Sequence, residues 1–460
     1  MEGQPFVLTA AGTDTDGDNL TYTWEQTAGT AVLVTDATIA VQTLDAPQVD
    51  VDEALSFEVT VSDGEDTATS TISISVEDLT SELSVSAPNI FNGSNPLPRL
   101  YALTANDDGG YRAYWERELG PVSPLGVFSS QDFTDQGLIF GEQVDGDFQL
   151  SSSVGTEFVE AVYKSGDALY YINRYNTRSS ETGFSFYEGL QTGAVFGPGD
   201  VIRLNDEPET FFLSIAGAPI GTNQLVTVST HNTDGADYTV NANILNPNGT
   251  SVETVLATPD FIVNEAAVAA FADNSFIGLW REYQTLDSSD ITNLGDSDVY
   301  MQRMAMDGTL LGDKVKLNLA LDASRPMAVT LQDGNIFLAW NVATGIRVRI
   351  IRPDGTFATP VMILPDSGVL QNIVALNTNQ VLITRSTVGE LVAQVVNSDG
   401  TSGSNDFIVF TEPEASNLTT NVIATTLNDN RVILGWELVT FTDPGSTRES
   451  FTAGLLPVGQ

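Results

Sequence analysis

The feature that most constrains this chain is a strand motif that recurs seven times at long intervals. Each copy begins with a turn and continues as an apolar stretch: GGYRAYWER, DALYYINRY, NQLVTVSTH, NSFIGLWRE, GNIFLAWNV, NQVLITRST and NRVILGWEL. Equivalent positions lie about 54 residues apart on average, at Trp115, Ile172, Val228, Trp280, Trp340, Thr384 and Trp436. Such a repeat folds as one supersecondary unit that buries its apolar faces against its neighbours.

A second marker recurs in step with the first. Glycine turns separate two strand-like stretches in TDQGLIFG, LQTGAVFG, NPNGTSVE, AMDGTLLG, RPDGTFAT and NSDGTSGS, and most of them carry the Asx-Gly pair of a hairpin. Three or four strands in each repeat of about 40 to 55 residues are typical of a β-propeller. The sequence therefore predicts a seven-bladed propeller over residues 80–460.

The ends of the repeat array predict how the ring closes. The last copy lacks an outer strand before the final ESFTAGLLPVGQ. Residues 81–91, SELSVSAPNIF, are similar to the outer strands DVIRLND and KVKLNLA, so we expect them to pair with the last blade. The third copy, FFLSIAGAPIGTNQLVTVST, has no aromatic residue at the expected place, which leaves six blades plus an irregular one as the alternative.

Residues 1–79 follow a shorter pattern. FVLTA, LTYTWEQ, LSFEVTVSDG and ATSTISISVED alternate apolar residues with Thr or Ser, which is the period-two signal of half-buried strands. Asp, Gly and Pro occupy the turns between them. Many short strands without helices in fewer than 100 residues predict a β-sandwich, with Trp24 packed between its two sheets.

This unit resembles the bacterial PKD-type (polycystic kidney disease repeat) immunoglobulin-like domains. The resemblance rests on the EG opening, on DTDGDNLTYTW and on the closing VSDG, and it covers about one sixth of the chain. Such domains usually have one more strand before EG. Because Met1 is followed directly by EGQPFVLTAAG, which reads as the middle of a strand, we expect the chain to be part of a larger multidomain protein.

The opening turn is a candidate calcium loop. Asp14, Asp16 and Asp18 stand at alternate positions around Gly17, so several carboxylate oxygens can converge on one ion. The resemblance implies calcium near this loop and adds Glu2 and Asp63, at neighbouring strand ends, as further ligands. The alternative is a hairpin turn with solvated acids. The pattern differs from an EF-hand, which has a glutamate at position 12 of its loop.

The net charge of the chain limits the classes of partner that it can bind. It has 61 acidic and 18 basic residues, a formal net charge of −43. Such a surface repels phosphate backbones, which argues against nucleic acid and anionic membranes. No apolar run is long enough to span a bilayer and no signal-peptide pattern is visible. There is no cysteine, and an acidic, cysteine-free β-protein favours an extracellular or cell-surface location in bacteria.

An acidic insertion, LDSSDITNLGDSDVY (286–300), separates two strands of the fourth repeat. Its carboxylates are Asp287, Asp290, Asp296 and Asp298, which form a candidate loop for an ion or a basic partner. The alternative is a long solvated loop. Loops on a rigid scaffold are where binding residues gather, so the insertion is retained as a possible binding loop.

Catalytic motifs are weak. His231 is the single histidine, and VSTHNTDGADY offers no nucleophile elbow around it, so we expect an exposed histidine at a strand end. The turns MDGTLL and PDGTFA share only D-G-T with the Asp-boxes of sialidases. Arg347, Arg349 and Arg352 lie on one strand and its hairpin, whereas a sialidase gathers three arginines around a carboxylate. No carboxylate pair stands out for glycoside hydrolysis.

These observations predict an all-β protein, a PKD-type β-sandwich followed by a seven-bladed propeller, that is not an enzyme. We expect a calcium-stiffened spacer carrying a propeller that binds a glycan or a protein. The tryptophans of the repeats are interpreted as core, and the candidate exposed aromatics are Tyr170, Tyr171, Tyr175 and Tyr187. The alternatives are a polysaccharide lyase or glycosidase with its site in the propeller mouth, and a purely structural element of a surface assembly.

Overall fold

The fold was determined as a computed structural model of the whole chain. It describes residues 5–32, 34, 36–47, 53–76, 99–118, 126–134, 139–149, 156–165, 168–176, 182–190, 202–203, 210–221, 223–233, 237–246, 250–260, 262–284, 296–318, 322–364, 368–376, 379–403, 406–411, 417–428, 431–442 and 445–455. In part of the strands, above all in β9 to β13 and β32, only the backbone is described. The described residues form strands and turns, and none belongs to a helix long and apolar enough to cross a membrane.

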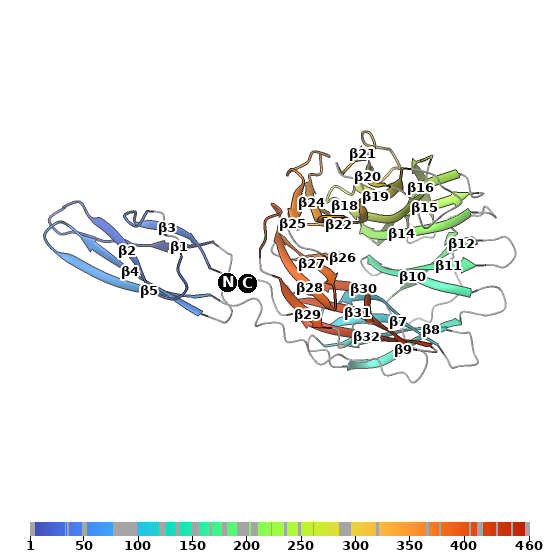
Figure 1. Cartoon of the computed structure of the whole chain (residues 1–460), viewed down its shortest axis with the longest axis horizontal. Helices are drawn as coiled ribbons and strands as arrows, with labels where there is room; N and C mark the ends of the chain where they lie inside the picture. The colour runs from blue at the N-terminus through green and yellow to red at the C-terminus, as the bar shows by residue number, and fades with distance from the viewer. Residues whose placement is uncertain are drawn as a thin grey trace.

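The N-terminal unit is a sandwich of two antiparallel sheets (Figure 1). One sheet pairs β1 (Pro5–Thr9) with β3 (Val41–Asp45), and the other has the order β2 (Thr21–Ala28), β4 (Glu53–Ser62), β5 (Thr67–Val76). Leu8, Leu44, Leu55 and Phe57 fill the space between the sheets together with Trp24. The tryptophan is buried and its Nε1 donates to the carbonyl of Ile39 at 3.1 Å, which confirms its predicted place in the core.

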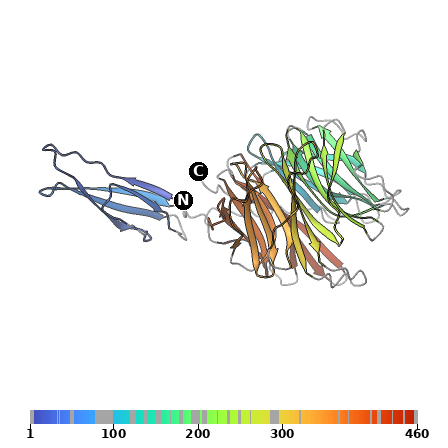
Figure 2. The ribbon, with the colours of Figure 1, turned by 90° about the horizontal axis from the view of Figure 1, so that it is seen from above.

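The remaining strands form seven antiparallel sheets, the blades of a β-propeller (Figures 1 and 2). Blade 1 contains β6 (Arg99–Ala105), β7 (Tyr111–Glu118), β8 (Gly126–Phe133) and β9 (Ile139–Gln149). Blade 2 contains β10 (Thr156–Ser165), β11 (Ala168–Asn176), β12 (Thr182–Leu190) and β13 (Ile202–Arg203). Blade 3 contains β14 (Thr210–Ile220), β15 (Gln224–Thr233), β16 (Asp237–Leu245) and β17 (Ser251–Ala257).

The other four blades have the same order. Blade 4 contains β18 (Val263–Ala270), β19 (Phe276–Tyr283), β20 (Ser297–Met304) and β21 (Val315–Lys316). Blade 5 contains β22 (Ser324–Thr330), β23 (Ile336–Val342), β24 (Gly345–Ile351) and β25 (Met362–Leu364). Blade 6 contains β26 (Val369–Ala375), β27 (Gln380–Thr387), β28 (Glu390–Asn397) and β29 (Phe407–Thr411). Blade 7 contains β30 (Asn417–Thr426), β31 (Val432–Thr442) and β32 (Gly445–Leu455).

The first strand of each blade is the innermost one, and these seven strands form a closed ring. Each contacts the first strand of the next blade, and β30 contacts β6, so blades 7 and 1 are neighbours. The backbone N–H of Leu100 in β6 donates to a carboxylate oxygen of buried Glu437 in β31 at 2.8 Å across this junction. Residues 81–91 lie outside the described residues, so their pairing with the last blade stays a prediction; among the described residues that blade has three strands.

The second strand of each blade supplies most of the core, as the repeat predicts. The marker residues of six copies are buried there: Trp115, Val228, Trp280, Trp340, Thr384 and Trp436. Separate apolar clusters fill the spaces between successive blades from blade 3 to blade 7. Burial of both sheet faces explains why these strands are near-continuous apolar runs in the sequence.

The glycine turns are hairpins between the third and fourth strands of blades 4, 5 and 6. Gly308, Gly355 and Gly400 have φ between 82° and 87°, which an L side chain rarely adopts. The aspartate before each glycine accepts the backbone N–H of the following threonine, for example Thr309 N to Asp307 Oδ1 at 2.9 Å. The Asx-Gly pairs therefore have the local role that the sequence predicts.

Every inner strand also carries a β-bulge near its start, where its register against the second strand shifts. In blades 4 and 5 the bulge residues Glu265 and Arg325 have φ of 54° and 48°, which is uncommon outside glycine. A bulge turns backbone groups away from the ladder. Here it directs an N–H of one inner strand toward the neighbouring blade.

Candidate binding site in the central channel

A cavity of about 940 Å³ lies on the propeller axis. All seven inner strands line it, with one representative residue for each blade being Thr104, Tyr163, Gly217, Ala270, Val329, Ile373 and Ala424. Its volume is within the range of about 300–1,000 Å³ that small-molecule sites occupy. Because no blade forms it alone, the cavity depends on the closed ring.

The described side chains of the lining are mostly apolar and none is charged, although polar atoms contribute a large part of the cavity surface. Alanine, glycine, valine and isoleucine predominate, and no Asp, Glu, His, Lys or Arg occurs among the lining residues that the structure describes. Each inner strand is the edge of its sheet, so one row of its backbone groups has no ladder partner. Side chains of the next blade satisfy some of these groups: Thr330 Oγ1 donates to the carbonyl of Ala270 at 2.5 Å, and Thr426 Oγ1 to that of Ala375 at 2.6 Å.

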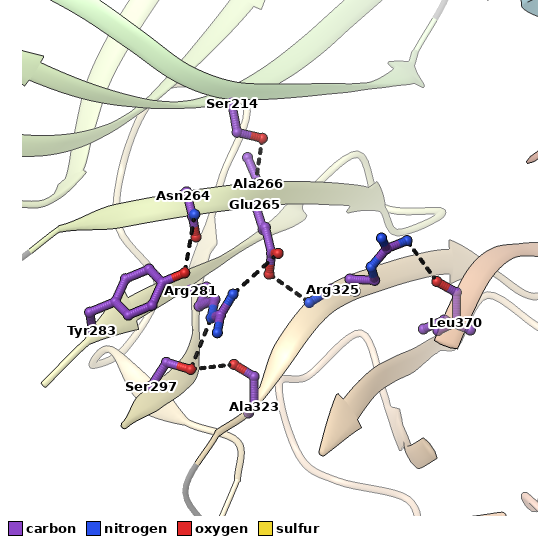
Figure 3. A network of polar contacts seen from close by, with 10 residues as sticks. All are labelled: Ser214, Asn264, Glu265, Ala266, Arg281, Tyr283, Ser297, Ala323, Arg325 and Leu370. Carbon is purple, nitrogen blue, oxygen red and sulfur yellow. Dashed lines mark hydrogen bonds and ion pairs between the residues drawn. The ribbon is translucent and has the colours of Figure 1, made fainter. Parts of the chain in front are cut away.

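The bulges form one rim of the channel, where charged groups bind to neighbouring blades (Figure 3). Glu265 Oε2 accepts the backbone N–H of Arg325 at 2.7 Å, and its Oε1 lies 3.3 Å from the guanidinium of Arg281. Arg325 donates in turn to the carbonyl of Leu370 at 3.2 Å. The Ala266 N–H donates to Ser214 Oγ at 2.9 Å. These contacts connect blades 3 to 6. The charged side chains of Glu265 and Arg325 are used to bind neighbouring blades to each other.

The turns between first and second strands form the opposite rim. Neighbouring turns are linked: Gly221 N donates to Asn274 Oδ1 at 3.1 Å, and Asn379 Nδ2 donates to Asp333 Oδ2 at 3.0 Å. Asn274 and Asn379 adopt positive φ, which Asn tolerates better than most residues. Exposed carboxylates follow this rim at Asp107, Asp108, Asp273 and Asp333. The channel therefore opens onto an acidic rim at this end.

The structure places His231 differently from the sequence prediction. His231 lies within β15 and is 1% exposed, so the expectation of an exposed strand-end histidine is wrong. Its Nε2 lies 2.6 Å from Ser229 Oγ, and burial lowers its pKa to about 4. The alternation of Thr227, Ser229 and His231 has the pattern of a solvent-facing side, but in this blade that side is covered.

The candidate calcium loop is an exposed turn organised by one carboxylate. Asp14 Oδ1 accepts the backbone N–H groups of Asp16, Gly17 and Asp18 at 2.7–2.9 Å. These bonds, that from Asp18 first, lower the pKa of Asp14, while the charge of nearby Asp63 raises it. Glu2 lies outside the described residues. Within the described ranges no three acidic or histidine side chains are gathered as a metal site, and the calcium assignment stays a prediction.

The acidic insertion is only partly described. Asp287 and Asp290 lie outside the described residues, and Asp296 is half-buried before β20. Asp298 is buried within β20, 2.7 Å from Lys316 Nζ, and accepts from Asn318 Nδ2 at 2.8 Å. Its interpretation as a loop residue is therefore wrong, since its carboxylate joins two strands of blade 4. The candidate aromatics Tyr170, Tyr171, Tyr175 and Tyr187 lie in β11 and β12, where side chains are outside the description.

The fold and the channel together define a two-unit all-β protein, an immunoglobulin-like sandwich followed by a seven-bladed propeller. Residues 2–76 match the family model described as K319L-like, PKD domain, which agrees with the resemblance seen in the sequence. A comparison with curated proteins found no match to the chain.

Solved structures resemble the chain at low identity. A protein of unknown function from Dyadobacter fermentans DSM 18053 matches with a TM-score of 0.44 and 10% identity, over 79% of this chain and 96% of that one. A quinonprotein alcohol dehydrogenase-like protein from Bacteroides thetaiotaomicron VPI-5482 gives 0.40 and 10%, over 99% and 95%. An α-L-arabinanase from Penicillium chrysogenum, complexed with arabinobiose, gives 0.44 and 11%, over 81% and 97%. Such likeness carries no information on ligand or activity.

Proposed function

We propose that the propeller is a non-catalytic binding module whose site is the central channel. The observation that supports this most is the cavity of about 940 Å³, which all seven blades line and in which none of the described lining residues is charged. A concave, mostly apolar site with a few polar groups is the usual form of a ligand pocket. Among the polar groups of the lining, Thr330 Oγ1 and Asn372 Nδ2 donate to backbone carbonyls, which leaves Thr330 Oγ1 and Asn372 Oδ1 to accept from a guest.

The chemistry of the lining favours binding over catalysis. General acid–base chemistry needs a group whose pKa lies near the operating pH. The titratable groups in the described lining are Tyr101 and Tyr163, and burial raises the pKa of Tyr163 to about 12, so this phenol stays protonated. The lyase or glycosidase alternative has no comparable observation in its favour.

Charge suggests which ligands enter. The acidic rim with Asp107, Asp108, Asp273 and Asp333, and the net charge of −43, disfavour anionic ligands. The uncharged lining disfavours a guest that would bury a charge without a partner. The ligand is therefore a neutral glycan or a neutral segment of a protein.

The sandwich is proposed as a spacer stiffened by calcium, in a protein that works outside a bacterial cell or on its surface. Support comes from the PKD-type match, the absence of cysteine and the exposed loop with Asp14, Asp16, Asp18 and the neighbouring Asp63. Calcium would reduce repulsion among these carboxylates and bind the loop to the adjacent turn. Glu2 remains a proposed ligand.

The proposal that the channel binds a ligand is tested by substitutions that narrow the channel. Ala424→Phe and Val329→Phe place a ring in the lining from two different blades, and Val252→Phe, on the exposed side of β17, is the matched control. Labelled wild type is applied to an array of neutral and acidic glycans and to a library of neutral peptides. We expect neutral ligands only, with about tenfold or greater loss in both channel variants and none in the control. Binding that survives both channel variants would contradict the proposal.

The proposed calcium site is tested by thermal unfolding of the protein with and without calcium. Ligand binding to the native state at a hundredfold excess over its Kd stabilises by about 2.7 kcal/mol. Asp16→Ala/Asp18→Ala removes two proposed ligands but retains Asp14, whose carboxylate organises the turn. We expect calcium to raise the Tm of the sandwich transition in the wild type and not in the double variant. Equal curves with and without calcium in the wild type would leave the loop as a solvated turn.

A further inference from the structure

One edge of the sandwich is a long strand without a neighbour. β5 is the last strand of the sheet β2–β4–β5 and pairs with β4 alone (Figure 1). Its ten residues include no proline and no charged residue, and its register against β4 continues without a bulge. Residues 67–73 are all exposed. Among the described residues, none binds the backbone groups on the outer side of this strand.

Several other sheet edges of the molecule are short, bulged or covered. The outer strands β21 and β25 have two and three residues. The ladders that hold β17 and β29 each contain a bulge. At the other edge of the same sandwich sheet, the backbone N–H of Trp24 donates to the carbonyl of Ala37 at 2.9 Å. Such features prevent a sheet edge from pairing with another chain, and the described part of β5 has none of them.

The core-facing side of β5 is also uncovered in its middle. Ile72 pairs with fully buried Phe57 of β4 and lies on the same face of the sheet, yet it is 41% exposed. The sheet opposite has two strands, and Phe6 of its β1 packs against Phe57, with ring centroids 5.9 Å apart. The opposite sheet therefore covers β4 but leaves Ile72 open. A strand added beside β5 would place an apolar side chain next to Ile72.

The charges around β5 indicate which kind of strand fits. Residues 1–79 contain no Lys or Arg. Glu65 and Asp66 are exposed in the turn before β5, and Glu53 pairs with Val76 at its end. A second copy of the sandwich would bring the same acidic charges into contact and would be repelled. A strand with a basic residue at each end is complementary to this edge.

We propose that β5 binds an extended segment of another protein, which joins the sheet as a fourth strand. The segment alternates apolar and uncharged polar residues, so that an apolar side chain covers Ile72, and it carries Lys or Arg at both ends. Hydrogen bonds between the two backbones supply the affinity, while the apolar contact and the end charges supply the specificity. This surface belongs to the sandwich alone and does not depend on the proposed function of the channel.

The test uses labelled peptides of about nine residues that alternate Thr and Val. One has Arg at both ends, the second has Glu at both ends, and the third keeps the Arg ends but groups its valines together. Ile72→Lys places a charge at the edge, and Val7→Lys, at a 57% exposed position of β1, is the matched control for the added charge. We expect the first peptide to bind the whole chain about tenfold or more tightly than the other two, with about tenfold loss in Ile72→Lys and little change in Val7→Lys.

Amide hydrogen exchange of the whole chain locates the bound peptide. Pairing at the edge should slow exchange in β5 and leave exchange in β2 unchanged, whereas attachment by charge alone would slow neither. The proposal is overturned if the first peptide does not bind, if the peptide with grouped valines binds equally well, or if both lysine variants lose the same affinity. Protection of β5 in the chain alone at high concentration would also overturn it, because a second copy would then be the occupant.

Discussion

The two faces of the blade 3 sheet differ sharply although they belong to the same strands. The face toward blade 4 presents Val226, Val228 and Val240 to Phe276 and Trp280 in one apolar cluster. The face toward blade 2, where Gly217 opposite Thr227 meets Tyr163, is polar. Its buried side chains, which we call the polar face, are Thr227, Ser229, His231, Asn241 and Asn243. Alternation in sequence thus places mainly apolar side chains on one face and polar side chains on the other, although both faces are buried.

The largest effect is expected where the apolar face is broken. Trp280 is fully buried, and its Nε1 donates to Glu282 at 2.7 Å. Trp280→Ala leaves a cavity between blades 3 and 4 and should lower the free energy of unfolding by about 3–5 kcal/mol. Urea unfolding of the whole chain measures this, with Trp280→Phe as a milder control. A loss below about 1 kcal/mol would mean that the interface collapses to fill the cavity.

The polar face should make stability depend on pH. Burial lowers the pKa of His231 from 6.5 to about 4, so between these values the unfolded chain binds a proton that the folded chain does not. Stability therefore falls as pH drops from about 6.5 to about 4, by about 3 kcal/mol at most.

His231→Gln isolates this effect from the titration of the many carboxylates. Urea unfolding at a series of pH values should show the wild type losing stability relative to the variant, by up to about 3 kcal/mol, as pH falls through this window, because only the wild type binds this proton on unfolding. Parallel curves would show that His231 keeps its ordinary pKa in the fold.

The same comparison shows how much of the fold could be predicted from the sequence. The apolar runs around Trp280, Trp340 and Trp436 predict buried second strands, and their spacing predicts seven blades. Thr384 and Val228 occupy equivalent buried places without an aromatic ring, so spacing was a better guide than residue type. Local pattern is sufficient here because each blade is a local unit.

The contacts between blades that close the ring around the channel could not be predicted from the sequence. Glu437 accepts the N–H of Leu100 across the ring junction, 337 positions away, and Glu265 accepts that of Arg325 from the next blade. These pairs depend on bulges that shift the register, and no local pattern marks a bulge formed by ordinary residues. The prediction that Asp298 lies in a loop is wrong for a related reason. Its partner Lys316 lies on β21, the other side of a hairpin, and no local pattern in the sequence links the two residues.

A smaller effect should follow from placing a hydroxyl on the apolar face. Val228→Thr keeps the shape of the side chain but buries an Oγ against blade 4 among apolar neighbours. We expect the free energy of unfolding to fall by about 1–3 kcal/mol, the cost of a buried group without a partner. Urea unfolding measures the change, and a loss near zero would show that this face accommodates polar groups as the other one does.

The reciprocal exchange one residue earlier should have the smallest effect. Thr227→Val removes a buried hydroxyl that has no partner on the polar face. Without ligand we expect the free energy of unfolding to stay within about 0.5 kcal/mol or to rise by up to about 1 kcal/mol, since the group removed forms no bond in the free protein. A loss comparable to that of Val228→Thr would mean that ordered water already satisfies Thr227 at the interface with blade 2. The sign of the difference between these adjacent, nearly isosteric variants therefore tells whether the Thr227 hydroxyl is left without a hydrogen bond in the folded protein.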